Sequence, residues 1–326
     1  MAASVAVSAA LVKELRERTG AGMVDCKNAL VQSDGDVGRA IEFLREKGLA
    51  AAAKKAGRIA SEGLVLSLIS EDGDVGSIVE VNSETDFVAK NEEFRGFVEG
   101  VASLAQSHPE DSVEDFLTRE WPDGGSVKDA LIGKIAIIGE NLTIRRKDVF
   151  NKQNERCALV SYVHGGGRVA VMMELGVAEG YASCCGSNGG ACGCALGEVG
   201  KNIAMQIAAM SPRFISRDEI SQDFIDKERE ILKQQALEEN KDKPKPESVL
   251  EKMVEGRLNK LLKDYCLLEQ EYVKDSDLTV AAYLETQREY AGGSVSIMRF
   301  VRYETGEGIE KKEENFAEEV SKAMQV

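Results

Sequence analysis

Residues 80–91, which read EVNSETDFVAKN, place a carboxylate directly beside a large apolar ring at Asp86 and Phe87. An apolar run typical of a buried β-strand precedes this pair, and apolar residues at helical spacing follow it. The segment is therefore predicted to form the corner between a strand and a helix. A carboxylate and a ring at such a corner can be inserted into another molecule, or they can be a helix cap and a core residue. The residues alone leave both interpretations open.

A second group of reactive side chains is a cysteine cluster. Cys184, Cys185, Cys192 and Cys194 lie within 11 residues of a glycine-rich segment, and four thiolates can bind zinc tetrahedrally. Structural zinc sites usually pair two CxxC motifs, and CC followed by CxC departs from that spacing. The cluster is thus a weak candidate for a metal site, and a loop of reduced thiols is the alternative.

Histidine-based and phosphate-binding sites have few candidates. The chain contains two histidines, His108 and His164, and it has neither a GxxxxGK[ST] motif nor a GxGxxG motif between a strand and a helix. Residues 164–167 (HGGG) resemble an oxyanion-hole loop, but no GxSxG motif accompanies them, and glycines at a predicted hairpin tip supply positive φ angles. We therefore expect no cofactor and no covalent chemistry.

Composition narrows the class of partner and the location. Lys and Arg total 41 against 56 Asp and Glu, a net charge of −15, whereas nucleic-acid binding needs a basic surface. The basic run at residues 145–147 is short, and we expect it at the solvated end of a strand. No apolar run reaches the roughly 18 residues of a membrane span, and the N-terminus lacks the charged start of a leader peptide. Seven cysteines, an odd number, fit a reducing compartment, so the expected location is the cytoplasm.

The N-terminal part is predicted to be a small helical unit. Apolar spacing indicates three helices over residues 8–48. Asp36 is the expected N-cap of the third helix and Gly48 its expected end. The alanine-rich residues 50–60 are then expected to be a linker.

From Gly63 onward the apolar period changes from the helical period to two. Residues 64–81 are predicted to form a β-hairpin, followed by a helix that contains Phe94 and a closing strand at 141–146. A second unit repeats this plan with a hairpin at 158–175, a helix at 203–210 and a strand at 295–303. The two hairpins lie about 94 residues apart, which indicates an internal repeat of α+β units.

An insert and a tail complete the chain. Two amphipathic helices separated by a Lys-Pro-Lys-Pro turn at 243–246 are predicted to form an antiparallel hairpin, either a dimer or partner surface or an ordinary packed pair. Their apolar faces are Ile220, Phe224, Ile231 and Leu232 on the first, and Leu250, Val254, Leu258, Leu261 and Tyr265 on the second. The tail from Glu304 is predicted to be a polar helix and docking arm that carries Ile309, Phe316 and Val320.

Two long motifs resemble one protein family. Residues 15–23 (LRERTGAGM) with 25–29 (DCKNA), together with residues 80–90 (EVNSETDFVAK), closely resemble translation elongation factor Ts, the guanine-nucleotide exchange factor for elongation factor Tu. Further matches cover residues 40–48, 139–146, 251–258 and 301–320. The resemblance therefore extends in order over nearly the whole chain.

The resemblance implies an α+β fold with antiparallel sheets and five parts. These are an N-terminal ubiquitin-associated-like three-helix domain with its linker (1–56), core subdomain N (57–149), core subdomain C (150–215 and 266–303), an inserted antiparallel coiled-coil hairpin for dimerisation (216–265) and a C-terminal helical module (304–326).

The resemblance also implies a mechanism. A GTPase holds GDP through a phosphate loop and Mg²⁺; Phe87 is expected to wedge between partner side chains on the Mg²⁺ side of that site, while Asp86 disturbs the surroundings of the metal. GDP release then follows because the factor stabilises nucleotide-free elongation factor Tu. The residues implied to contact this partner are Thr85, Asp86, Phe87, Val88, Ala89, Lys90, Asn91, Arg18, Met23, His164, Ile309 and Phe316, and none of them is a catalytic residue.

Three departures from the family pattern stand out. Val24 occupies a position where the family often has a second methionine. Residues 134–140 read KIAIIGE where shorter members have KIGE, which would displace the contact expected from Ile137 or Ile138. The cysteine-rich loop at 181–197 is an insertion relative to such members.

Two other classes of function remain as alternatives. One is a ubiquitin-associated-type adaptor that binds another protein through the N-terminal helices. The other is a metal-regulated or redox enzyme built around the cysteine loop. The absence of a transit peptide favours a bacterial source, and a mature organellar form, which would also lack one, stays an alternative.

Overall fold

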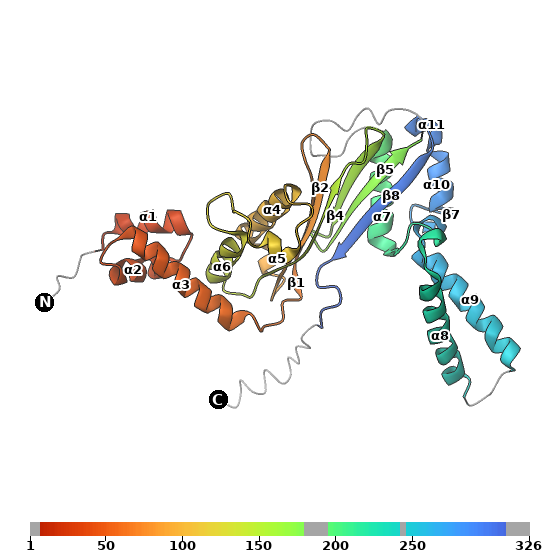
Figure 1. Cartoon of the computed structure of the whole chain (residues 1–326), viewed down its shortest axis with the longest axis horizontal. Coiled ribbons are helices and arrows are strands. Elements are labelled where there is room, and N and C mark those ends of the chain that lie inside the picture. Colours follow the sequence, from red (N-terminus) through yellow and green to blue (C-terminus); the bar gives the residue numbers. More distant parts are fainter. Residues whose placement is uncertain (1–6, 179–194, 242–245, 311–326) are drawn as a thin grey trace.

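A computed structural model describes residues 7–178, 195–241 and 246–310 (Figure 1). Within these residues the fold is α+β, with small antiparallel sheets. The helices are α1 (Ala9–Thr19), α2 (Met23–Gln32), α3 (Val37–Lys55), η1 (Val88–Lys90), α4 (Glu92–Gln106), α5 (Val113–Phe116), α6 (Val127–Ile138), α7 (Ala195–Met210), η2 (Arg217–Glu219), α8 (Gln222–Glu239), α9 (Glu247–Tyr265), η3 (Leu267–Glu269), α10 (Val280–Thr286) and α11 (Arg288–Ala291). The strands are β1 (Glu62–Ile69), β2 (Val75–Ser83), β3 (Thr143–Asn151), β4 (Cys157–His164), β5 (Val169–Val177), β6 (Glu271–Tyr272), β7 (Asp275–Thr279) and β8 (Val295–Glu304).

Two three-stranded sheets form the centre of the molecule, with the orders β1-β2-β3 and β4-β5-β8. Because side chains alternate across a strand, β2 directs Val79 and Val81 towards the helices and Ile78 towards the other sheet. α4 and α6 pack on the outer face of the first sheet, and α7 and α10 pack on the second. The result is four layers in the order helix, sheet, sheet, helix (Figure 1).

The repeat predicted from the two hairpins is present in the packing of the sheets. β2 is the central strand of the first sheet and β5 that of the second, and both neighbours of each central strand are antiparallel to it. Ser67 of β1 and Ser161 of β4 are 94 residues apart, and their hydroxyl oxygens are 2.6 Å from each other between the sheets. Glu80 and Glu174 occupy equivalent positions, each at an irregularity in strand pairing. The two units therefore face each other through equivalent residues.

The N-terminal helices are confirmed, but the predicted end of the third helix is wrong. α3 continues past Gly48 to Lys55, because the alanines that follow are strong helix formers. Gly48 lies where α3 faces α6, and a Cβ at this position would meet Ile132 at 3.5 Å, an ordinary van der Waals distance. Arg45 of α3 also pairs with Asp129 of α6 at 2.6 Å. The helix therefore packs directly against the first α+β unit.

α8 and α9 form the expected antiparallel pair and project from the body (Figure 1). Three details of its predicted apolar faces are wrong. Ile220 precedes α8 and does not lie within it. Ile231 is 51% exposed. In α9 the predicted Leu261 is only partly buried, and its neighbour Leu262 is buried instead. The apolar contacts gather at the base of the hairpin, around Ile220, Leu258, Leu262 and Cys266. Further out, Ala236 and Val254 are still buried between the helices, whereas Ile231, Leu237 and Val249 are exposed.

Two further predictions are corrected. The basic run at 145–147 lies within β3 and not at a solvated strand end, because Arg145 and Arg146 bind the buried carboxylate of Glu80. Ile309 lies in a turned segment after β8 and not in a helix. Phe316, Val320 and the cysteines at 184, 185, 192 and 194 lie outside the described residues. Among the residues that are described, no helix is long and apolar enough to cross a membrane.

Candidate functional site

The corner (residues 84–91) connects the central strand β2 to α4. Ser83 ends the strand, and its hydroxyl donates to the carbonyl of Thr85 at 2.9 Å, which turns the chain away from the sheet. One 3₁₀ turn, η1, follows. Asn91 then caps α4 by accepting from the backbone N–H groups of Glu93 and Phe94 at 2.8 and 3.3 Å. Both ends of the corner are thus held by local hydrogen bonds.

Asp86 and Phe87 project from this corner into solvent. The Phe87 side chain is 78% exposed, the most exposed of the large apolar side chains in the described part of the chain. Lys90 lies beside both residues, with its Nζ 3.0 Å from the Asp86 carboxylate and 5.7 Å from the centre of the Phe87 ring. The pair is therefore neither a helix cap nor a core residue: Asn91 is the cap, and Val88, at 7% exposure, enters the core.

Two glutamates hold the backbone of the corner. Glu140 accepts from the N–H of Thr85 at 3.0 Å and from its hydroxyl at 2.7 Å. Reciprocally, Glu84 accepts from the N–H of Asn141 at 2.7 Å and pairs with Arg58 at 3.4 Å. The residue just before Asp86 is therefore fixed by charge-assisted hydrogen bonds to the loop after α6.

Arg95 joins the corner to the tip of the second hairpin. Its Nε donates to the carbonyl of Ala89 at 2.9 Å, and its Nη2 donates to the carbonyl of Gly166 at 3.2 Å. His164 is exposed in the same hairpin turn, where its Nδ1 lies 3.0 Å from the Tyr162 hydroxyl. The structure thus links the segment that carries Phe87 to the turn that carries His164.

Arg18 and Met23 lie on the N-terminal helical unit. Arg18 is exposed beside Glu14, 3.8 Å away, and Met23 is 57% exposed at the start of α2. The turn between them meets the end of α6, since a Cβ at Gly20 would lie 3.0 Å from Ile137. Ile137 belongs to the lengthened KIAIIGE segment, in which α6 ends at Ile138. The extra residues therefore lie in the last turns of this helix and contact the N-terminal unit.

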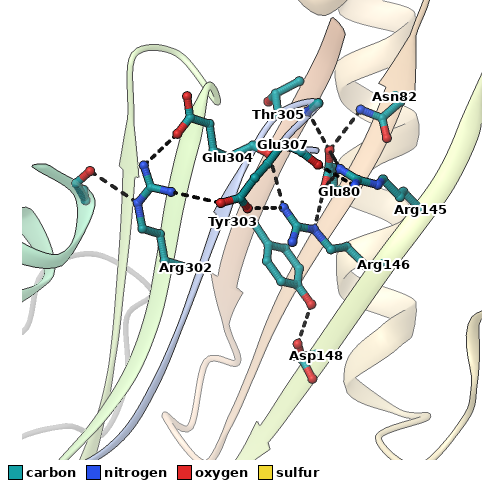
Figure 2. Close-up of polar contacts among 12 residues, drawn as sticks. Glu80, Asn82, Arg145, Arg146, Asp148, Arg302, Tyr303, Glu304, Thr305 and Glu307 are labelled. Carbon is teal, nitrogen blue, oxygen red and sulfur yellow. Dashed lines mark hydrogen bonds and ion pairs between the residues drawn. The ribbon is translucent and has the colours of Figure 1, made fainter. Parts of the chain in front are cut away.

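The C-terminal turn (residues 304–310) lies against the same strand that leads to the corner (Figure 2). The Glu80 carboxylate, fully buried, accepts from the N–H of Gly306 at 2.8 Å and pairs with Arg145 and Arg146 at 3.1 and 2.5 Å. Arg146 also reaches the Glu307 carboxylate at 3.1 Å. Burial alone would lower the pKa of Arg146, but Glu80 and Glu307 outweigh it and raise that pKa above its ordinary value.

Several of these positions escape sequence reasoning. Glu140 stands within one of the matched motifs, but nothing in the motif indicates that it binds Thr85 across the fold. Arg95 follows the pattern of an exposed residue on an amphipathic helix, and no sequence signal distinguishes it. Conversely, Val88 was expected to contact a partner, and its burial removes its side chain from that role.

The chemistry that this arrangement offers is recognition. An exposed ring and a carboxylate stand on a backbone that is fixed from both sides. Within the described residues, no group of three or more His, Cys, Asp or Glu side chains could hold a metal ion. The four cysteines that are a weak candidate for a zinc site lie outside those residues, so both the zinc site and the alternative loop of reduced thiols stay untested.

Comparison with known proteins agrees with the motif resemblance. A family model described as elongation factor Ts matches residues 84–307. A protein of Clostridium botulinum named elongation factor Ts is 50% identical over 321 residues, which cover 98% of this chain and 99% of the relative. A Clostridium acetobutylicum protein with the same name is 49% identical over 320 residues, again 98% and 99% of the two chains.

Proposed function

Because this chain belongs to the elongation factor Ts family, we propose that it is the guanine-nucleotide exchange factor of elongation factor Tu. It binds the GDP-bound partner, promotes release of GDP and leaves a nucleotide-free complex that GTP can enter. Its own residues perform no covalent chemistry in this cycle. Its expected place of action is the cytoplasm, in translation elongation.

The mechanism rests on coupled binding equilibria. If the factor binds nucleotide-free elongation factor Tu more tightly than the GDP complex, GDP affinity falls by the same ratio. A GTPase holds its nucleotide through a phosphate loop and Mg²⁺. We assign Phe87 to wedge between partner side chains on the Mg²⁺ side, and Asp86 to disturb the charges that order the metal. Neither role requires a proton transfer.

The observation that carries this proposal is the exposed Phe87 ring on a fixed backbone. At 78% exposure the ring has most of its apolar surface in water, and covering that surface with a partner would lower the free energy of the complex. The hydrogen bonds from Thr85 to Glu140 and from Arg95 to Ala89 hold the segment in place before binding. Such preorganisation reduces the entropy lost on association.

Further contacts with elongation factor Tu are proposed for the exposed side chains of Arg18, Met23 and His164, and for Ile309 in the C-terminal turn. These residues lie on three different parts of the fold. Arg95 connects the corner to the His164 turn. Ile137, at the end of α6, contacts the turn between Arg18 and Met23, and Glu140 in the loop after α6 binds Thr85 of the corner. We infer that the partner contacts the N-terminal helices, the His164 turn and the C-terminal turn as well as the corner.

The test is release of a fluorescent GDP analogue from purified elongation factor Tu with catalytic amounts of this chain. The wild-type chain should accelerate release, and the double variant Asp86→Ala/Phe87→Ala should lose about 100-fold in kcat/KM, as expected for a binding hot spot. The control is Tyr290→Ala, which removes another exposed aromatic ring, 55% exposed, from the second unit. No acceleration by the wild-type chain would overturn the proposed function.

A folding control separates the two roles of the Asp86–Phe87 pair. Both residues are exposed, so the double variant should unfold in urea at nearly the wild-type concentration. A large loss of stability would show that the pair is structural.

The helical hairpin is the proposed surface for a homodimer. Ile231, Leu237 and Val249 are exposed on it, at 51%, 45% and 41%. Sedimentation velocity of the wild-type chain and of Ile231→Asp tests this. A monomer at all concentrations would reject a dimer.

A further inference from the structure

Two fully buried glutamates occupy equivalent positions in the two units, and they hold different segments of the chain. Glu80 of β2 pairs with Arg146 of β3, and Glu174 of β5 pairs with Arg299 of β8. Glu174 accepts a further hydrogen bond from the N–H of Gln153, two residues after the end of β3. Glu80 accepts the equivalent hydrogen bond from the N–H of Gly306, two residues after the end of β8. Each glutamate therefore holds the chain that leaves the sheet of the other unit, but only the turn held by Glu80 carries a residue proposed to contact a partner, Ile309.

The contact with Gly306 belongs to a network that ties the C-terminal turn to the first sheet (Figure 2). Arg145 donates to the carbonyl of Glu307, and Arg146 donates to the carbonyl of Glu304 at 3.2 Å. Arg302 pairs with the Glu304 carboxylate at 2.8 Å. Glu80 is the one carboxylate in this group that is completely shielded from water, so its bonds to the two arginines and to Gly306 act in a low dielectric.

The turn also fits its site closely. Gly306 has φ of 71°, and a Cβ there would lie 1.9 Å from the carbonyl oxygen of Ser61. Thr305 donates its hydroxyl to the carbonyl of Gly167 at 3.1 Å, in the same hairpin turn as His164. The C-terminal turn therefore contacts the start of β1, the strand β2 and the tip of the second hairpin.

We propose that Glu80 is a positioning residue for nucleotide exchange, an inference that rests on the proposed function. Its carboxylate fixes the C-terminal turn to the strand that ends at Asp86 and Phe87. The two segments assigned to contact elongation factor Tu are thereby held in one arrangement before the partner arrives. Glu80 itself never touches the partner, because it is buried between the sheets.

The physical consequence concerns binding more than the maximal rate. In Glu80→Gln a single oxygen is left to accept from Gly306 and the two arginines, the amide nitrogen faces these donors as another donor, and Arg145 and Arg146 lose their shared counter-charge. The C-terminal turn must then be ordered during association, which costs affinity. Phe87 and the clamp on Thr85 by Glu140 are unchanged, so the step in which bound partner loses GDP should proceed as before.

The experiment compares Glu80→Gln with Glu174→Gln in the full chain. Both variants replace a buried, arginine-paired carboxylate by an amide of the same shape, so both should lose stability. In the GDP-release assay, the concentration of Glu80→Gln that gives half-maximal rate should rise about fivefold, with the maximal rate within about twofold of wild type. For Glu174→Gln both quantities should stay within about twofold of wild type.

A second variant tests whether Glu80 acts through the C-terminal turn. Gly306→Ala should displace the turn by its clash with Ser61 while leaving the Glu80 carboxylate in place. If Glu80 acts through this turn, the double variant should be no weaker in exchange than either single variant. Hydrogen exchange of the amides at 304–310 should be faster in Glu80→Gln and Gly306→Ala, and unchanged in Glu174→Gln.

The outcomes separate this inference from the proposed function. If the wild-type chain fails to release GDP, the proposed function is wrong. If wild type is active and Glu80→Gln and Glu174→Gln weaken exchange equally, Glu80 has only a structural role and the inference is overturned. Additive effects of Glu80→Gln and Gly306→Ala, or unchanged hydrogen exchange at 304–310, would overturn it as well.

Discussion

The two α+β units are built alike, around equivalent pairs of a buried glutamate and an arginine. In the first, Arg146 pairs with Glu80 and stacks 4.0 Å from the ring of Tyr303; in the second, Arg299 pairs with Glu174 and stacks 4.1 Å from the ring of Phe150. Each arginine thus reaches across to an aromatic ring of the other unit. Both units therefore share the same framework, a buried glutamate paired with an arginine that stacks on a ring, and this framework stabilises the fold.

The first unit shows what is attached to that framework. The central strand of the first unit continues into a corner that exposes Asp86 and Phe87 and is clamped by Glu140. The same unit also holds the C-terminal turn through Glu80 and Gly306. Glu174 holds Gln153 in the corresponding way, and most of the connection after β5 that corresponds to the corner lies outside the described residues. The residues proposed to contact a partner are thus side chains placed on a repeated framework, because a site needs specific side chains and not a particular fold.

The largest expected effect tests the shared framework. Arg299→Ala leaves Glu174 buried without its ion-pair partner and should lower the free energy of unfolding by about 3 kcal/mol. Arg146→Ala should cost less, about 2 kcal/mol, because Arg145 still pairs with Glu80 at 3.1 Å. Urea unfolding of both variants measures the difference. An equal loss of unfolding free energy in the two variants would mean that Arg145 does not replace Arg146 as the partner of Glu80.

The next effect tests the two hydrogen bonds by which Glu140 holds Thr85 in the corner. Glu140→Ala removes both acceptors of Thr85, so the corner should become mobile and kcat/KM for GDP release should fall about tenfold. The control is Glu269→Ala, which removes a comparable carboxylate from its pair with Arg217 in the second part of the molecule. Exchange should be unchanged there. If Glu140→Ala exchanges as fast as wild type, the clamp has no role in exchange.

A smaller effect tests the hydrogen bond between the equivalent residues Ser67 and Ser161, where the two sheets meet. Ser67→Ala and Ser161→Ala each remove one hydroxyl from a pair that is bonded across the sheets, and each should cost about 1 kcal/mol of stability. The Ser161 hydroxyl also donates to the carbonyl of Ser67 at 2.9 Å. The double variant should cost less than the sum of the single variants, since the lost interaction is shared. Strict additivity in urea unfolding would contradict a shared bond.

The smallest effect concerns the helical unit that only the first α+β unit carries. Hydrogen bonds from Ser126, together with Arg45, lower the pKa of Asp129 to about 2. Because the folded pKa lies below the unfolded value of 3.8, the stabilisation is complete above that value and is lost as the pH falls towards 2. It should amount to about 1 kcal/mol for this partly exposed group.

Urea unfolding between pH 5 and pH 3 measures this contribution. The stability of Asp129→Asn should depend less steeply on pH than that of the wild-type chain, whereas Asp123→Asn, at an exposed position, should follow wild type. Identical slopes for wild type and Asp129→Asn would show that the carboxylate contributes nothing.

Much of the architecture was predictable because local patterns determine local structure. The period of two at 64–81 and 158–175 predicted both hairpins, and the spacing of Phe94 and the residues after it predicted α4. The failures share one cause. Gly48 was expected to end a helix and Arg145–Arg146 to lie in solvent, yet a neighbouring helix and a buried carboxylate decide their surroundings.

The sequence by itself determined the element types, the repeated unit and the family, since periodicity and motif identity are properties of neighbouring residues. It also singled out Asp86 and Phe87 while leaving them either exposed or buried. Only the tertiary structure decided that Phe87 is exposed and Val88 buried, and that Glu80 binds Gly306, 226 residues further along the chain. Burial and long-range pairing depend on how the sheets and helices pack, and no local pattern encodes that.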